Sequence, residues 1–361
     1  MMQSLKNLHK IEVPTFFYAL LVFLPISFYL YFFTQNNVWI FITSILSLIP
    51  IAVIMGYTTK QISLQSNPTV GGLVSATFGN SIELIIAIIA LRQGLIEVVR
   101  GSIIGSIIGN ILLLIGLSIM IGGFKFKHQR FNKEAIGVSS TMLIIAVVGI
   151  VTPSLYAFIN PHGINSQIFS EFVAVIMAVI YIAGLIFSLK THKDLFDASD
   201  EIRATREKAV ISIKFASMIL LFITILAAVE SEFLVSAIKG AAVSLGLTET
   251  FIGIVVIAII TNVAEKSTAI HFALENRLDL SLEIGLSSAT QIALFVVPIL
   301  VFVSHIFGFG FLLSFSVFEI ISIILAVMII NNLAADGRCN WLEGAQLISV
   351  YLIIAIAFFF V

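Results

Sequence analysis

The chain has 361 residues, of which 59% are hydrophobic and only 11% are charged, and its formal net charge is −1. A soluble protein of average composition carries about 25% charged residues, so this composition indicates a chain that crosses a membrane several times. The apolar runs are as long as helices, whereas membrane barrel strands alternate over about ten residues. We therefore expect an all-α polytopic membrane protein, and the net charge gives no sign of a nucleic-acid partner.

The chain has a single cysteine, Cys339. One cysteine excludes an internal disulfide and a cysteine-rich metal site. The first apolar stretch, at about 13–33, is too long for a signal peptide and lacks a small-x-small cleavage site. We therefore interpret it as the first membrane span.

Eleven stretches have roughly the 20 mostly apolar residues that a transmembrane helix needs. They lie at about 13–33, 37–56, 69–91, 96–122, 135–153, 166–189, 209–230, 249–274, 281–304, 311–331 and 341–361. The remaining apolar stretch, 231–248, contains Glu232, Lys239 and Gly240. We interpret that stretch as a connector at the membrane interface.

Lysine and arginine placement predicts the orientation. If the N-terminus is cytosolic, fifteen of the 19 Lys and Arg residues fall in cytosolic segments and three fall outside, with Lys266 inside a span. Positive charge concentrates on the cytosolic side of membrane proteins. The sequence therefore predicts a cytosolic N-terminus and, with eleven spans, an extracytosolic C-terminus.

The longest polar stretch, 190–208, divides the chain near its middle. We predict four segments: an extra N-terminal helix at 1–36, a first five-helix repeat at 37–189, a cytosolic linker at 190–208 and a second five-helix repeat at 209–361. Asp194, Asp197 and Glu201 could share one face of a helix in the linker and form a regulatory cation site. The stretch carries five acidic and five basic residues, and a solvated linker between the repeats is the favoured interpretation.

A glutamate stands deep inside an apolar run in each half of the chain. Asn80-Ser81-Ile82-Glu83 corresponds to Asn262-Val263-Ala264-Glu265, and Ser106 to Asn110 corresponds to Ser287 to Gln291. Five spans in each half force opposite orientations, so the two halves form an inverted repeat. Carboxylates at membrane depth are costly and mark functional sites.

These residue types suit a hard divalent cation, which takes six or more oxygen ligands. Glu83 and Glu265 would supply the charge, and the other ligands would be the amide and hydroxyl groups of Asn80, Asn262, Asn110, Gln291, Ser106 and Ser287. Two empty ionised carboxylates in a low dielectric are unfavourable, so protonation competes with the cation. Glu83 and Glu265 are therefore also the predicted proton-coupling groups.

Structural interpretations remain open for some of these residues. Interhelical hydrogen bonding is the alternative for the individual Asn, Gln and Ser side chains. Gly101, Gly105 and Gly109, which are spaced four apart, could let backbone carbonyls open toward an ion, and close helix packing is the alternative interpretation. Three glutamates lack a repeat counterpart or lie near span ends, and we leave them out of the site: Glu171, Glu230 and Glu319. His271 follows Glu265 by six residues and so differs from it in direction by most of a turn, and we expect it near the cytosolic mouth and not among the ligands.

On these segments the sequence resembles the calcium/proton exchanger family of the calcium/cation antiporter superfamily. The family carries a Gly-Asn-x-x-Glu segment in each half, followed by Gly-Ser…Asn in one half and Ser-x-x-x-Gln in the other. The matching segments begin here at Gly79, Gly105, Asn262 and Ser287. The resemblance covers nearly the whole chain, and it implies exchange of cytosolic Ca²⁺ for external H⁺ with Glu83 and Glu265 as the binding groups.

Three positions depart from the family pattern. Thr261 stands where glycine is usual, Ser75 where asparagine is frequent, and Lys266 where histidine usually follows the second glutamate. Adjacent helix residues diverge by about 100°, so we expect Lys266 to face away from Glu265.

The expected protein is thus a secondary active antiporter of the cell membrane that works by alternating access. We expect no cofactor beyond the transported Ca²⁺ and H⁺. The expected partners are these ions and the lipid bilayer, and the sequence leaves open whether the protein forms a homo-oligomer. The alternatives are a Na⁺- or K⁺-coupled exchanger and an exchanger that prefers Mn²⁺ or another divalent cation. No His-Glu-x-x-His or Gly-x-Ser-x-Gly segment favours an enzyme, and the inverted repeat argues against a channel.

Overall fold

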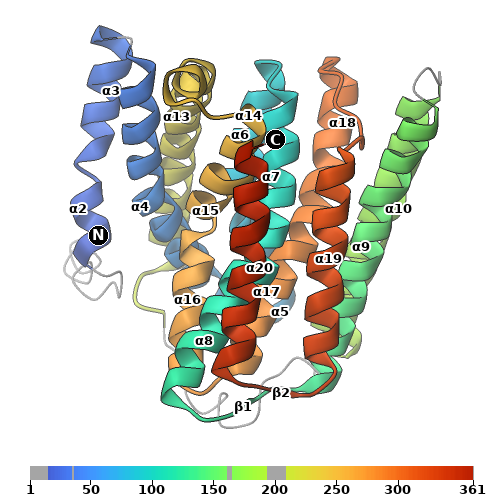
Figure 1. Cartoon of the computed structure of the whole chain (residues 1–361). Coiled ribbons are helices and arrows are strands. Elements are labelled where there is room, and N and C mark those ends of the chain that lie inside the picture. Colours follow the sequence, from blue (N-terminus) through green and yellow to red (C-terminus); the bar gives the residue numbers. More distant parts are fainter. Residues whose placement is uncertain (1–14, 35, 161–164, 193–208, 361) are drawn as a thin grey trace. The chain divides into compact units, whose positions relative to one another are not determined.

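The computed structural model describes residues 15–34, 36–160, 165–192 and 209–360. Nearly all of these residues are helical (Figure 1). Most of the linker expected at 190–208, including Asp194, Asp197 and Glu201, lies outside the described residues, as does the N-terminal segment before residue 15.

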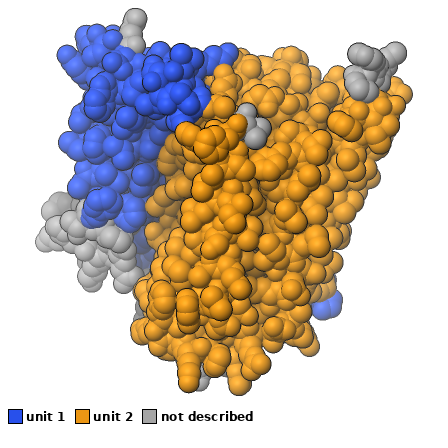
Figure 2. All heavy atoms as spheres, in the orientation of Figure 1, with its two compact units in different colours: residues 1–89, 189–247 blue, residues 90–188, 248–361 orange. Residues whose placement is uncertain are grey.

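The helices divide into two compact units, coloured separately in Figure 2. Unit 1 contains residues 1–89 and 189–247, and unit 2 contains residues 90–188 and 248–361. Each unit therefore takes helices from both halves of the sequence. These units group residues by their contacts, whereas the predicted repeats at 37–189 and 209–361 group them by sequence order. The repeats stay a prediction.

Unit 1 is built around two long helices that pack along each other, α4 (Asn37–Ser63) and α13 (Ile213–Leu245). Asn36 caps the first of these helices and Ser212 caps the second. The other helices of unit 1 are α2 (Thr15–Leu20), α3 (Phe23–Phe33), α5 (Pro68–Gly79) and most of α6 (Ser81–Arg92).

The prediction of an interfacial connector at 231–248 is wrong, because helix α13 continues unbroken to Leu245. The stretch contains no proline, and its apolar residues Phe233, Ala237 and Ala241 lie one turn apart and are buried. Lys239 is exposed, so its charge does not oppose the helix. The helix ends at Gly246, whose φ of +67° is a left-handed conformation that glycine adopts at low cost.

Unit 2 contains two inner spans of 30 residues, Ile96–Lys125 and Leu278–Phe307. The first is α7 (Ile96–Ile108), η2 (Gly109–Leu114) and α8 (Ile115–Lys125), and the second is α17 (Leu278–Gln291), η5 (Ile292–Val296) and α18 (Val297–Phe307). A π-helical segment thus contains Asn110 in one span and begins directly after Gln291 in the other. The two inner spans therefore share an irregularity at the positions of these two residues.

The remaining elements of unit 2 surround these inner spans. They are α9 (Lys133–Ile159), α10 (Ser166–Ile186), η3 (Phe187–Thr191), α14 (Glu249–Phe251), η4 (Ile252–Ile257), α15 (Ala258–Thr261), α16 (Val263–Leu274), α19 (Val317–Ala334) and α20 (Trp341–Phe360). Two short strands, β1 (Gln129–Arg130) and β2 (Arg338–Cys339), pair antiparallel at one end of unit 2 (Figure 1). The last residues of η3 belong to unit 1.

Glycine lets two elements of unit 2 approach closely. A Cβ atom at Gly101 would lie 2.7 Å from the carbonyl oxygen of Thr250, and one at Gly105 would fall on the backbone of Ile254. A Cβ atom at Gly109 would meet nothing within 4 Å. Gly101 and Gly105 are therefore packing residues between α7 and the α14–η4 segment, whereas Gly109 is not.

Within the described part of the chain, nine helices are long and apolar enough to cross a membrane. Two bent pairs raise the number to eleven if each pair is one span: Val70–Gly79 with Ser81–Arg92, bent by 43°, and Glu249–Thr261 with Val263–Leu274, bent by 56°. This agrees with the eleven spans expected. The protein is a polytopic helical membrane protein.

Candidate ion-binding site

Each predicted Asn-x-x-Glu segment breaks a span. Helix α5 ends at Gly79, Asn80 lies outside helical geometry with φ −110° and ψ 25°, and α6 begins at the next residue. The carbonyl of Asn80 then accepts a hydrogen bond of 3.1 Å from the backbone N–H of Leu84. Glu83 therefore lies in the first turn of α6, where the positive end of the helix dipole favours a carboxylate. Its side chain is buried, with 7% of its surface exposed.

The second break has the same construction. Helix α15 ends at Thr261, Asn262 has φ −96° and ψ 20°, and its carbonyl accepts a 3.1 Å hydrogen bond from the N–H of Lys266. Glu265 then lies in the first turn of α16. Discontinuous helices of this kind form the ion sites of many transporters, because half-helix ends offer dipoles and carbonyls to a substrate.

Side chains satisfy the carbonyl groups that the second break leaves without partners. The Thr261 hydroxyl donates to the carbonyl of Ile257, and the Asn262 amide donates to that of Ala258. The Lys266 ammonium donates to the carbonyls of Ala258 and Ile259, at 3.2 and 3.3 Å. A positive charge at the C-terminal end of a helix is stabilising. Lys266, one of the departures from the family pattern, is thus buried with its ammonium at the break.

Four polar side chains meet in the interior of unit 2. The Asn110 amide nitrogen donates to Asn262 Oδ1 at 3.0 Å and to Ser288 Oγ at 2.8 Å. The Asn262 amide nitrogen donates to Ser106 Oγ at 3.2 Å. The structure thus brings together three of the predicted residues and adds Ser288. The predicted Ser287 instead donates weakly within its own helix, to the carbonyl of Ile284 at 3.4 Å.

The amide oxygen of Asn110 is buried and accepts no hydrogen bond from the described residues, although the amide nitrogen makes two. Burying an acceptor without a donor is costly, so such groups are rare and call for a reason. A bound cation would supply one, because amide oxygens are ligands of hard cations. The remaining candidate of unit 2, Gln291, is the last residue of α17. Asn80 and Glu83 belong to unit 1 and the other candidates to unit 2.

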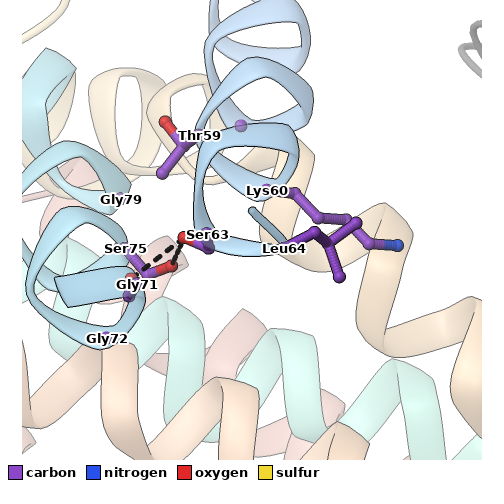
Figure 3. A pocket seen from close by; sticks show the side chains of 9 residues that line it. Thr59, Lys60, Ser63, Leu64, Gly71, Gly72, Ser75 and Gly79 are labelled. Carbon is purple, nitrogen blue, oxygen red and sulfur yellow. Dashed lines mark hydrogen bonds between the residues drawn. The ribbon is translucent and has the colours of Figure 1, made fainter. Parts of the chain in front are cut away.

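An open cavity of about 420 Å³ lies in unit 1 between the second half of α4 and α5 (Figure 3). Its lining includes Thr59 and Ser63 from α4 and Ser75 and Gly79 from α5. Ser63 lies 2.9 Å from both the carbonyl oxygen of Gly71 and the hydroxyl of Ser75, which ties the two helices together. The cavity therefore extends to Gly79, the last residue of α5, which directly precedes Asn80 at the first break.

A third intramembrane carboxylate lies in unit 1, and the sequence reasoning left it out. Glu230 on α13 is fully buried and accepts hydrogen bonds from Ser27 Oγ at 2.6 Å and from Ser47 Oγ at 2.7 Å. The two serines come from α3 and α4. Glu230 thus links three helices of unit 1. In the sequence, the only sign of this role is that Glu230 is a lone carboxylate within an apolar run.

The other omitted carboxylates have local roles. Glu319 forms a capping box with Ser316 at the start of α19. Glu171 on α10 pairs with His305 on α18, with 2.7 Å between Oε1 and Nδ1. Both contacts are structural, and neither arrangement requires an ion.

Broken helices, each with a carboxylate directly after the break, are typical of the ion sites of secondary transporters. The model of the family described as sodium/calcium exchanger protein matches residues 36–190 and 215–360. A Ca²⁺/H⁺ antiporter of Aphanothece halophytica is 40% identical over 362 residues, covering 96% of each chain. The Ca²⁺/H⁺ antiporter ChaA of Bacillus subtilis is 38% identical over 315 residues, which cover 87% of this chain and 90% of ChaA.

Solved structures agree with this grouping. The structure of native YfkE matches with a TM-score of 0.84 at 34% identity, over 96% of this chain and 100% of YfkE. The H⁺/Ca²⁺ exchanger CAX matches in fold, with a TM-score of 0.74 at 15% identity. The chain therefore belongs to the sodium/calcium exchanger protein family, in its calcium/proton exchanger branch. It is a membrane antiporter and not an enzyme.

Proposed function

We propose that this protein exports cytosolic Ca²⁺ in exchange for external H⁺ by alternating access. The observation that carries the proposal is the pair of helix breaks, each with an asparagine at the break and a glutamate three residues later. The relatives named Ca²⁺/H⁺ antiporters, at 40% and 38% identity over most of the chain, support the choice of ions.

The proposed ligands divide into charged and neutral groups. Glu83 and Glu265 supply two negative charges, which match one divalent ion. The uncommitted oxygen of Asn110 is the best supported neutral ligand, and Gln291 and Asn80 would add further amide oxygens. Asn262 and Ser106 hold Asn110 and the second break in place through their hydrogen bonds.

Exchange follows from the charge balance of Glu83 and Glu265. A bound divalent cation or two bound protons neutralise both carboxylates, whereas the empty ionised pair is costly to enclose in a low dielectric. Only a loaded protein would then change from one facing state to the other. This requirement couples the exit of Ca²⁺ to the entry of H⁺ without a direct contact between the two ions.

We propose a cytosolic N-terminus and an extracytosolic C-terminus in the cell membrane. The positive-inside distribution and the odd number of spans support this orientation. The cavity beside Ser63 and Ser75 then opens near the cytosolic end of α4, where Lys60 lies. In Figure 3 the Lys60 side chain points away from Ser63 and Ser75. We assign this cavity to cytosolic access of the ion.

Calcium uptake into inverted membrane vesicles with an imposed proton gradient tests the proposal. We expect uptake that follows the gradient and is lost when an uncoupler is added. Uptake that ignores the proton gradient but follows a Na⁺ or K⁺ gradient would contradict proton coupling. If Mn²⁺ inhibited calcium uptake by half at a concentration below that of the Ca²⁺ present, calcium would not be the preferred ion.

A further inference from the structure

One helix of unit 2 carries a regular stripe of polar residues. Asp279, Glu283, Ser287 and Gln291 follow one another at intervals of four along α17. Between residues 281 and 291 of α17, the side chains that are not buried are Glu283, Ile284, Ser287 and Gln291. Residues four apart are neighbours on one helix face, so the accessible face of α17 is this stripe.

The other faces of α17 are covered within unit 2. This helix packs against α16, α9, α8 and the segment η2. Polar groups at membrane depth are rarely exposed to lipid, because hydrocarbon offers them no hydrogen bonds. A partly buried carboxylate, hydroxyl and amide in one line therefore suit contact with water better than contact with lipid, on a face that leads along α17 to Gln291.

Glu283 is the charged residue of this stripe nearest to Gln291. The Ser139 hydroxyl of α9 lies 2.9 Å from one carboxylate oxygen of Glu283 and 3.1 Å from the other. Within the described residues, Glu283 has no ion pair with a lysine, arginine or histidine. One hydroxyl hydrogen cannot satisfy a carboxylate, which has about four acceptor positions. Glu283 is thus oriented by Ser139, and no other described residue donates a hydrogen bond to its carboxylate.

We propose that Glu283 is a capture site for the hydrated divalent cation on its cytosolic access path, a role that rests on the proposed function. Glu283 lies one turn from Ser287 and two turns from Gln291, a rise of about 12 Å along the helix. A single carboxylate does not neutralise a divalent ion, so binding at Glu283 is weak and brief. Its charge raises the local cation concentration before the ion reaches Gln291.

The test compares Glu283→Gln, which keeps the shape and loses the charge, with Glu134→Gln, which removes an exposed carboxylate at the start of α9. In inverted vesicles, Glu283→Gln should raise the apparent KM for Ca²⁺ about tenfold, the factor that one unit charge exerts in water on a hydrated divalent ion about 6 Å away. The maximal rate should stay within about twofold of wild type, and the KM should depend less on salt. Glu134→Gln should match wild type.

Two further variants separate capture from a structural tie. Ser139→Ala removes the tie between α9 and α17 and keeps the charge, so its KM should match wild type. Glu283→Cys allows the charge to be restored by a negatively charged methanethiosulfonate reagent, because the native Cys339 is buried. Restoration should return the KM toward wild type, and a positively charged reagent should not. This variant remains informative if Glu283→Gln folds poorly.

Several results would overturn the role of Glu283. The first is a wild-type KM and salt dependence in Glu283→Gln, and the second is an equal rise of the KM in Ser139→Ala. The third is loss of the maximal rate in Glu283→Gln, which would place Glu283 among the residues that carry out exchange. Absence of proton-driven uptake in wild-type vesicles would instead contradict the proposed function. The two failures are therefore distinguishable in one experiment.

Discussion

At the residue scale, the two glutamates differ in their surroundings although their backbones match. Glu83 is buried in unit 1, whereas Glu265 is half-buried in unit 2 and is followed by a lysine whose ammonium is held by backbone carbonyls. Both stand in the first turn of a half-helix directly after a break. The proposal that both charges are needed can be tested at each position separately.

We predict that Glu83→Gln and Glu265→Gln each abolish proton-driven calcium uptake. Each change removes a negative charge and a proton-binding group while keeping the size of the side chain. Uptake in vesicles, normalised to the amount of inserted protein, measures the effect. Glu171→Gln, which alters a carboxylate paired with His305 outside the site, is the control and should transport. Near wild-type uptake by either correctly inserted site variant would refute the proposed pair.

We predict that Asn110→Ala weakens calcium binding by at least about tenfold, because it removes the uncommitted buried oxygen of the network. It should leave the binding of protons by the glutamates intact. Ser288→Ala is the matched control, since it removes one hydrogen-bond partner of the Asn110 amide nitrogen and leaves the amide oxygen. Isothermal titration of purified protein compares the two. Equal affinities in both variants would reduce Asn110 to a packing residue.

Glu230 provides a prediction about stability. Glu230→Ala should lower the free energy of unfolding by about 2–4 kcal/mol, because it leaves the buried Ser27 and Ser47 hydroxyls without this partner and opens a cavity. Glu230→Gln keeps a hydrogen-bonding group of the same size and should lose less than half as much. Thermal unfolding in detergent measures both. Indistinguishable stabilities of the alanine variant and wild type would contradict a tie among α3, α4 and α13.

At the element scale, the packing of α7 against η4 depends on small residues. A Cβ atom at Gly105 would collide with the backbone of Ile254, whereas one at Gly109 has open space. We predict that Gly105→Ala lowers the unfolding free energy by about 1–3 kcal/mol, the usual cost of overpacking. Gly109→Ala, four residues along, should change stability little. If Gly109→Ala were less stable than Gly105→Ala, the close approach at Gly105 would not be what holds α7 against η4.

The sequence predicted the elements better than it predicted their ends and breaks. Apolar length predicted the spans, because a bilayer imposes a minimum length on every crossing helix. It failed at 231–248, where charged residues were mistaken for a boundary although exposed polar side chains do not end a helix. The motif predicted Asn80 and Asn262 as site residues but not that each marks a bend, which depends on how neighbouring side chains satisfy the freed carbonyls.

The same limit applies within the candidate site. Repeat correspondence predicted Ser287, yet Ser288 bonds to Asn110, because which face of α17 meets the network depends on helix rotation and not on residue type. Glu283 and the serines around Glu230 carried no motif, since their partners come from other helices. Spatial neighbours of this kind are set by tertiary packing and not by spacing along the chain.

At the scale of the whole molecule, each compact unit combines helices from both sequence halves, and the candidate ligands divide between the units. Asn80 and Glu83 belong to one unit, whereas Glu265, Asn110 and Gln291 belong to the other. The division by contacts therefore differs from the division into sequence repeats, although each unit supplies one glutamate of the proposed pair.

The central claim is that Ca²⁺ and H⁺ compete for the same two carboxylates. Protonation removes the charge that binds the cation, so calcium affinity should fall as the pH falls. When two protons compete with one ion, the dissociation constant changes by at most about a hundredfold per pH unit. The direct measurement is calcium binding to the purified protein between mildly acidic and alkaline pH. We predict a dissociation constant that rises steadily toward acid pH, and a constant that does not change with pH would contradict the account.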